Sequence, residues 1–276
     1  EGISVRFQDK MWPVEVQGAW VPAYTLNYAA NGGITTSSDG SVLAVAAEDG
    51  VALHGVATGE IIRWLRPADI EMPRQSTYVM REAIMEFSPD GSRIVEGSAK
   101  FAQARVWHVA DGAFDHHLPI GYGFQDVSFH PDGDRLAIAL YSPDGLNGTV
   151  RIWSVSSQAV VDEFVAHDRR VASVQYVNEG RQLVTGGHNL DGRVHVWDMA
   201  SGQRIRTLLQ NVHPKVGPSA TWIDAYYPSS AIVAISGWGA HMSYWNTNTW
   251  AELGKASIPG YCMIAPDGLT YVALDS

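Results

Sequence analysis

The sequence predicts an all-β protein built from one small antiparallel sheet that recurs along the chain. The clearest copy lies at 171–209, where four short apolar segments alternate with tight turns: 171–177, 182–187, 193–197 and 204–209. Period-two alternation with turn residues between the segments is typical of a four-stranded antiparallel sheet. Such a sheet cannot bury both of its faces alone, so it must pack against further copies.

Further copies are marked by the end of the third strand and by the first turn. The third-strand ending recurs at 105–107, 151–153 and 243–245. Each of these segments closes with Trp, and they follow one another at intervals of roughly 45 residues, the spacing of propeller blades. The first turn recurs as Pro-Asp-Gly at 89–91, 131–133 and 266–268. In this turn Pro presets φ, Asp bonds the local backbone, and Gly adopts a positive φ.

These residues resemble the WD40-repeat family, and the resemblance covers nearly all of the chain. Trp197-Asp198 is the family's literal dipeptide, and His167 stands in the place of the family's Gly-His. The resemblance implies a structural brace inside a blade, in which a His, a strand Ser or Thr, a turn Asp and the Trp are hydrogen-bonded. The matching residues are His167, Thr185, Asp191 and Trp197, and only the blade at 171–209 carries the full set.

Five complete blades are expected in chain order, and the fourth is the sheet at 171–209. The strands of the first are expected at 33–36, 42–47, 51–56 and 61–65. Those of the second are expected at 83–87, 93–97, 104–109 and 113–118, and those of the third at 126–129, 135–140, 149–154 and 160–164. Those of the fifth are expected at 220–226, 231–236, 241–246 and 251–253.

A sixth blade is expected from the two ends of the chain. Residues 261–264 and 270–274 read as first and second strands, while 2–7 and 14–16 read as a third and a fourth strand. The sequence therefore predicts a six-bladed β-propeller of four-stranded antiparallel blades, with the last blade shared by the two termini. Blade six would combine about 258–276 with 2–17, and the whole of 1–276 would form one domain. Closure by pairing the ends would remove exposed sheet edges.

Composition limits the classes of partner. The net charge of −10 argues against a nucleic-acid-binding surface, which needs clustered Lys and Arg. No apolar run is long enough to insert into a membrane. Cys262 is the only cysteine, so an internal disulfide is excluded. A cytoplasmic location is favoured, and an exported form stays open because the chain begins at Glu1 without Met.

No motif for catalysis, a cofactor or a metal is recognisable. The Gly-x-Gly segments at 121–123 and 237–239 lack the third glycine and the strand–helix context of a dinucleotide site. The adjacent His116 and His117 would point to opposite faces of a strand, and no histidine spacing matches a zinc site. We therefore expect no catalytic residues, no cofactor and no metal ligands.

The resemblance implies a non-catalytic scaffold for protein–protein interaction, or a subunit of a larger assembly, that binds a protein or peptide through its top-face loops. Aromatic and Arg side chains favour such hot spots. The candidate partner-binding residues in these loops are Tyr78, Phe101, Tyr141, Arg169, Arg170 and Trp238. The alternative is a propeller enzyme or small-molecule binder with a site at the mouth of the central channel, for which the scattered candidates are Arg81, Asp126 and Asp224.

Overall fold

The computed structural model describes most of the chain as strands and turns. The described residues are 6–7, 10–11, 15–16, 19–20, 30–47, 50–66, 83–98, 103–120, 123–142, 146–188, 191–210, 212–213, 217–218, 220–237, 241–257, 262–264 and 271–273. The chain divides into two compact units, Glu1–Gly121 and Tyr122–Ser276. Within the ranges just given, no helix is long and apolar enough to cross a membrane.

The first unit contains two four-stranded antiparallel sheets, which we call blades one and two. Blade one runs in the order β5 (Ala30–Thr36), β6 (Val42–Ala47), β7 (Gly50–Gly55) and β8 (Ile61–Leu65). Blade two is formed by β9 (Ala83–Phe87), β10 (Arg93–Ser98), β11 (Gln103–His108) and β12 (Phe114–Leu118). The two sheets share a core in which Leu53 of blade one and Trp107 of blade two are almost fully buried.

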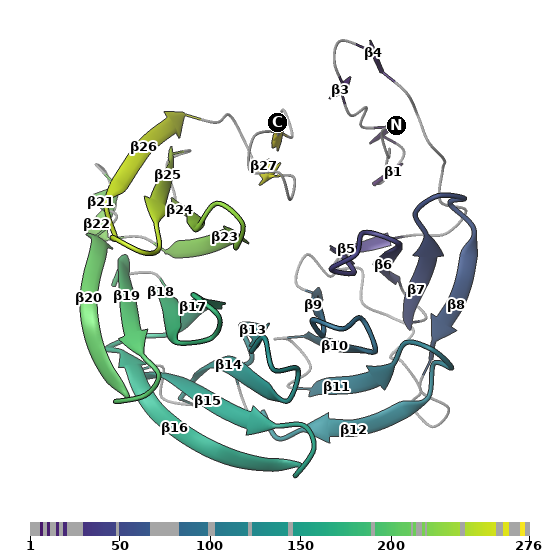
Figure 1. The fold of residues 1–276 in the computed structure, drawn as a ribbon, viewed down its shortest axis with the longest axis horizontal. Helices are drawn as coiled ribbons and strands as arrows, with labels where there is room; N and C mark the ends of the chain where they lie inside the picture. The colour runs from purple at the N-terminus through teal and green to yellow at the C-terminus, as the bar shows by residue number, and fades with distance from the viewer. Residues whose placement is uncertain are drawn as a thin grey trace. The chain divides into compact units, whose positions relative to one another are not determined.

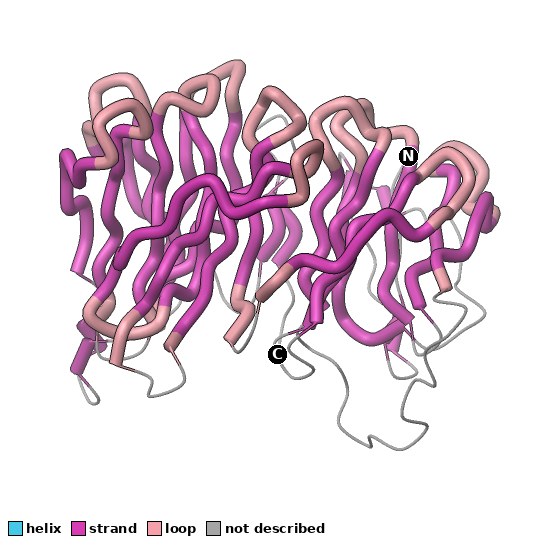
Figure 2. Tube along the Cα trace, turned by 90° about the horizontal axis from the view of Figure 1, so that it is seen from below, coloured by secondary structure: helices cyan, strands magenta, loops and turns pink. Residues whose placement is uncertain are grey.

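The second unit contains blades three, four and five. Blade three is formed by β13 (Asp126–Phe129), β14 (Arg135–Tyr141), β15 (Gly148–Ser154) and β16 (Ala159–His167). Blade four is formed by β17 (Val171–Val177), β18 (Gln182–Gly187), β19 (Arg193–Asp198) and β20 (Gln203–Gln210). Blade five is formed by β23 (Thr221–Tyr227), β24 (Ile232–Gly237), β25 (His241–Asn246) and β26 (Glu252–Ser257). In each blade the strands follow one another in sequence order (Figure 1), and the turns lie at both strand ends (Figure 2).

The expectation of six blades is wrong, because the described residues form five four-stranded sheets. The last two strands, β27 (Cys262–Ile264) and β28 (Tyr271–Ala273), pair with each other as expected but form a two-stranded sheet. At the start of the chain β1 (Arg6–Phe7) folds back on β2 (Lys10–Met11), and β3 (Glu15–Val16) folds back on β4 (Ala19–Trp20).

Chain entropy gives the physical reason for this difference. A tight hairpin closes a short loop at low entropic cost, whereas the shared blade needs segments from opposite ends of the chain. Strands of two residues in local hairpins do not provide the third and fourth strands of a blade. A further two-stranded sheet, β21 (Val212–His213) with β22 (Gly217–Pro218), follows blade four. The prediction of a single domain over 1–276 stays a prediction.

The core of the second unit lies between its blades, because alternate residues of each strand face opposite neighbours. Leu183 and Trp197 of blade four pack against Val150 and Ile152 of blade three. The next residues along the same strands face the other way, and Val184 and Val196 pack against Val233 and Trp245 of blade five. Burial on both faces explains why the middle strands are nearly continuous apolar runs.

Side chains of the first strands also bond to the backbone of the neighbouring blade. Oδ2 of Asp126, on β13, accepts a hydrogen bond of 2.9 Å from the amide of Val174 on β17. Its Oδ1 accepts a second bond of 2.9 Å from the amide of Val127. Burial raises the pKa of Asp126 to about 7, although both amide hydrogen bonds act in the opposite direction. This carboxyl therefore joins blades three and four, although its surroundings disfavour its charged form.

We expect Asp126→Asn to reduce the pH dependence of stability. In the unfolded chain this carboxyl titrates near its ordinary pKa of about 4, so between about pH 4 and 7 the folded chain binds more protons at this site. The free energy of unfolding contributed by Asp126 therefore falls as the pH rises through that window. Urea unfolding at low and at slightly alkaline pH measures the effect. A variant that loses as much stability as the wild type between the two conditions would contradict the assignment.

Candidate functional site

The four brace residues predicted from the sequence lie together in a buried hydrogen-bonded relay. Nδ1 of His167 lies 2.5 Å from Oδ2 of Asp191. Nε2 of His167 lies 2.9 Å from the Thr185 hydroxyl, and the indole N–H of Trp197 donates to the same hydroxyl at 3.0 Å. The exposed fraction is 0% for Thr185 and 8% for Trp197, the largest of the four. These contacts link all four side chains, and their role as a structural brace stays a prediction.

The direction of each bond follows from the chemistry of the groups. An indole N–H can only donate, so the Thr185 oxygen accepts from Trp197. The single Thr185 O–H is then available to donate to Nε2 of His167. His167 in turn donates from Nδ1 to Asp191. This is the arrangement that satisfies the hydroxyl and both ring nitrogens.

The relay crosses from one blade to the next. His167 is the last residue of β16 in blade three, whereas Thr185 lies on β18 and Trp197 on β19 of blade four. Asp191 lies two residues before the start of β19, and its second carboxylate oxygen lies 3.5 Å from a guanidinium nitrogen of Arg193. Burial raises the pKa of Asp191. The hydrogen bond from His167, the charge of His167 and the charge of Arg193 lower it by more than burial raises it, so the pKa lies below its ordinary value.

A glycine is required beside the relay. A Cβ atom on Gly187, the last residue of β18, would lie 2.6 Å from Oδ2 of Asp191 and 2.9 Å from Nδ1 of His167. Those distances are shorter than any ordinary contact of a Cβ atom with these groups. The Gly186-Gly187 pair that ends β18 therefore makes room for the acid–imidazole contact.

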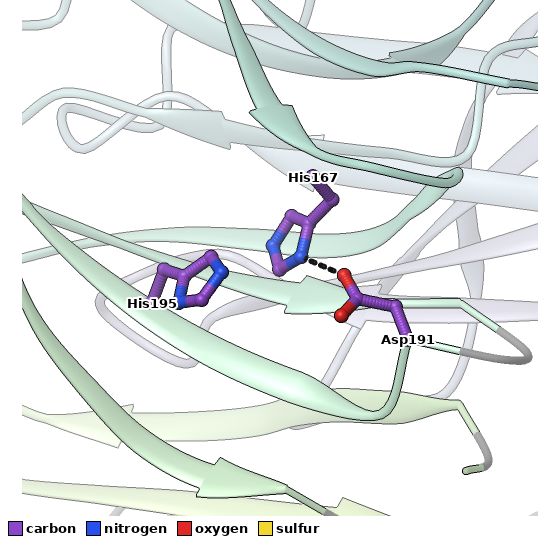
Figure 3. Close-up of side chains that lie close together, drawn as sticks. All are labelled: His167, Asp191 and His195. Atoms are coloured by element: carbon purple, nitrogen blue, oxygen red, sulfur yellow. Dashed lines mark hydrogen bonds and ion pairs between the residues drawn. The ribbon is translucent and has the colours of Figure 1, made fainter.

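His195 also belongs to this cluster, and the sequence analysis missed it. Its ring stacks on that of His167 with centroids 4.6 Å apart and planes 16° apart (Figure 3). Nδ1 lies 3.0 Å from the Thr207 hydroxyl, and Nε2 lies 3.3 Å from a guanidinium nitrogen of Arg204. Burial, with His167 and Arg204 nearby, lowers the pKa of His195 to about 4. The available signal was its place two residues before Trp197, which puts both side chains on one face of β19.

This cluster fits a hydrogen-bonded brace better than a metal centre. One ligand atom each from His167, Asp191 and His195 lie within 4.8 Å of one another. However, all four ring nitrogens already have hydrogen-bond partners, and the rings are stacked instead of directing their nitrogens at one point. A cation would also lie beside the Arg204 guanidinium. The expectation that this chain has no metal ligands stays a prediction.

The described partner-binding candidates, Tyr141, Arg169 and Arg170, lie at the opposite end of blade three from its Pro-Asp-Gly turn at 131–133. In the second unit we call this end, where each second strand stops and each third strand begins, the top face. Tyr141 is the last residue of β14, and Arg169 and Arg170 form part of the connection between β16 and β17. The Arg170 guanidinium stacks over the Tyr141 ring, 4.1 Å from its centroid. Tyr78, Phe101 and Trp238 lie outside the described residues.

Backbone contacts hold this pair of side chains in place. The amide of His188, directly after β18, donates to the carbonyl of Arg170 at 2.8 Å. A Cβ atom on Gly148 would lie only 2.0 Å from the carbonyl oxygen of Arg169, so the connection lies directly against the start of β15. Gly123 adopts a φ of +85°, and a Cβ there would overlap the Tyr141 ring. These contacts place the Arg169–Arg170 connection and the Tyr141 ring directly against neighbouring backbone.

The candidates for a site in the channel mouth are not brought into one cluster. Both carboxylate oxygens of Asp126 accept hydrogen bonds from backbone amides, as described above. Asp224 is exposed and accepts a hydrogen bond of 3.0 Å from the Ser236 hydroxyl. Arg81 lies outside the described residues. Asp126 thus has a structural role that sequence reasoning did not recognise, because its partner is the backbone of another blade.

We expect Asp191→Ala to lower the free energy of unfolding by about 1–3 kcal/mol, because His167 loses the acceptor of its Nδ1–H inside the protein. Asp198→Ala in the same blade is the matched control. Asp198 also accepts two hydrogen bonds, from the amide and hydroxyl of Ser201, but in an exposed turn. Chemical unfolding of both variants measures the two losses of stability, and the loss should be larger for Asp191→Ala. Equal losses of stability would show that burial of the relay does not matter.

Comparison with known proteins supports the resemblance. The family model described as "WD domain, G-beta repeat" matches residues 112–154 and 158–198. Each matched repeat begins at the fourth strand of one blade and ends with the third strand of the next, so the second repeat includes all four brace residues.

Several curated proteins are similar to parts of the chain. Transducin beta-like protein 3 of Bos taurus is 29% identical over 127 residues, which cover 46% of this chain and 15% of that protein. Periodic tryptophan protein 2 homolog of Dictyostelium discoideum is 23% identical, covering 71% of this chain and 20% of that protein. Cell division cycle 20.1, cofactor of APC complex, of Arabidopsis thaliana is 26% identical, covering 78% and 44%. The chain thus spans less than half the length of each of these relatives. The chain thus contains two segments that match the WD40 repeat, and both fall within its series of four-stranded sheets.

Proposed function

We propose that this chain is a non-catalytic interaction scaffold, or a subunit of a larger assembly, that binds a protein partner through its top face. The observation that carries the proposal is the stacking of Arg170, in the connection between blades three and four, on Tyr141 at the end of β14. Arg and Tyr are enriched among the residues that dominate binding energy in protein interfaces. This pair offers both side chains on one surface.

The rigidity of the surface supports the proposal further. Ordering a loop on binding costs free energy, and that cost is avoided where the loop is already fixed. The Arg169–Arg170 connection is held by the His188 amide and by contact with Gly148. Leu146, in the connection that follows Tyr141, has an exposed fraction of 54% and adds apolar surface. Exposed apolar, Arg and Tyr side chains in these connections are the composition of a protein interface rather than of a small-molecule pocket.

The relatives support a partner of the same general kind. The Arabidopsis relative carries the name of a cofactor of the APC complex, so a protein similar over 78% of this chain acts with a multi-protein complex. We extend only the general class, protein partners, to this chain. The proposed partner-binding residues remain Tyr78, Phe101, Tyr141, Arg169, Arg170 and Trp238, of which the three described ones gather between blades three and four.

The proposal is tested by capturing partners from the source organism with wild-type and variant protein, followed by quantitative mass spectrometry. Tyr141→Ala and Arg170→Ala are each expected to reduce capture of the same proteins by about tenfold, the effect of losing a hot-spot side chain. Their thermal midpoints should stay close to that of the wild type, because both side chains lie at the surface.

Gln203→Ala is the control, since Gln203 is an exposed residue at the start of β20, on the opposite end of blade four. Asp134 at that same end is unsuitable because it accepts bonds of 2.9 Å and 2.7 Å from Ser154 and Ser156. Loss of capture with Gln203→Ala and its retention with both top-face variants would place the interface elsewhere and refute the proposal.

A further inference from the structure

Two neighbouring arginines on the top face lack carboxylate partners. Arg169 and Arg170 are both exposed, and neither forms a hydrogen bond or ion pair through its guanidinium within the part of the chain that the structure describes. The contact that Arg170 does make is with the face of the Tyr141 ring. Stacking leaves the edge of the guanidinium, with its N–H groups, directed into the plane where a carboxylate would bind.

Most other described arginines are paired with an acidic side chain. The pairs are Arg93 with Asp115, Arg105 with Glu96, Arg135 with Asp132, Arg151 with Glu163, Arg181 with Glu179, and Arg193 with both Asp168 and Asp191. The chain carries 29 acidic residues against 19 Lys and Arg, so acceptors are abundant. Arg169 and Arg170 are thus two consecutive arginines that, like Arg206, have no acidic partner in the described ranges.

The groups next to the two arginines are His188 and Asp168. Burial lowers the pKa of His188, and the Arg170 charge lowers it further. Asp168, the nearest acidic residue in sequence, lies 3.5 Å from Arg193, with which it forms an ion pair. The carboxylate that adjoins the two arginines is thus paired with Arg193 and not with either of them.

We infer that Arg169 and Arg170 bind the carboxylates of an acidic protein segment, with Arg170 held in its binding orientation by Tyr141. This inference rests on the proposed function, because it names the chemistry of the partner at the same face. Arg forms two parallel hydrogen bonds to a carboxylate, and its stacked guanidinium loses little freedom when it does so. The exposed Leu146 in the preceding connection suits an apolar residue next to the acidic one.

A protein segment fits this surface better than a nucleic acid. A phosphate backbone is bound by a stripe of many Lys and Arg, and its affinity comes from the release of many counterions. Here the unpaired cations are two, Asp168 adjoins them, and the net charge of −10 repels a polyanion at long range. A few carboxylates on a short segment match two guanidinium groups in number.

The test is selection of a random peptide library on the immobilised full chain. We expect the wild type to select peptides enriched in Asp and Glu over the starting library. The double variant Arg169→Gln with Arg170→Gln should lose that enrichment. Arg206→Gln is the matched control, because Arg206 on β20 is equally exposed and has no carboxylate partner in the described ranges. It should select the same acidic peptides as the wild type.

A selected peptide is then measured by fluorescence anisotropy. Its affinity should fall by about tenfold when its Asp and Glu are replaced by Asn and Gln, and by a similar factor in the double variant. It should also weaken as salt is added, because exposed charges are screened. Selected peptides no more acidic than the library, or equal binding by the double variant, would overturn the inference. So would binding of a single-stranded oligonucleotide that the double variant loses while acidic peptides fail to bind.

The two proposals fail in different ways. If partner capture is lost with Tyr141→Ala but kept with the Arg169→Gln and Arg170→Gln double variant, the acidic class is wrong and the top face stays the interface. If capture is unaffected by all of these variants, the interface itself is wrong and the inference falls with it.

Discussion

The packing of blade four depends on the hydrogen bonds of the Thr185 hydroxyl. It accepts a hydrogen bond from the indole N–H of Trp197 and donates one to the imidazole of His167, so β16, β18 and β19 meet at one buried oxygen. His167 extends the relay to Asp191, and Gly187 leaves the space that this approach needs. An unpaired polar group at any of these positions would be buried without compensation. The relay thus fixes the end of β16 relative to β18 and β19.

The relay also lies next to the proposed interaction surface in the chain. The connection that carries Arg169 and Arg170 begins directly after His167 and Asp168, and its carbonyl at Arg170 accepts the amide of His188, which follows Gly187. Both ends of the surface are therefore tied to residues that border the relay. A scaffold of this kind contributes to affinity by holding hot-spot side chains in their bound positions before the partner arrives.

Sequence reasoning found what is local to one repeat. The turns and the Trp-ended strands located all five complete blades, and the brace was found because its four residues lie within one repeat of the pattern. The prediction of a sixth blade was wrong, because that blade required the two distant ends of the chain to pair, and no local sequence pattern indicates such pairing. The stacking of Arg170 on Tyr141 and the bond from Val174 to Asp126 were also beyond the sequence, because each joins side chains and backbone of adjacent blades.

The central claim is that the brace acts as one unit, and a double-mutant cycle between its two ends tests this most directly. Asp191→Ala removes one end, and Trp197→Phe removes the indole N–H at the other while keeping an aromatic ring. If the relay is continuous, the two losses in free energy of unfolding should be coupled by about 0.5 kcal/mol or more. Losses that add to within about 0.3 kcal/mol would mean that the two ends act independently, and would contradict the account.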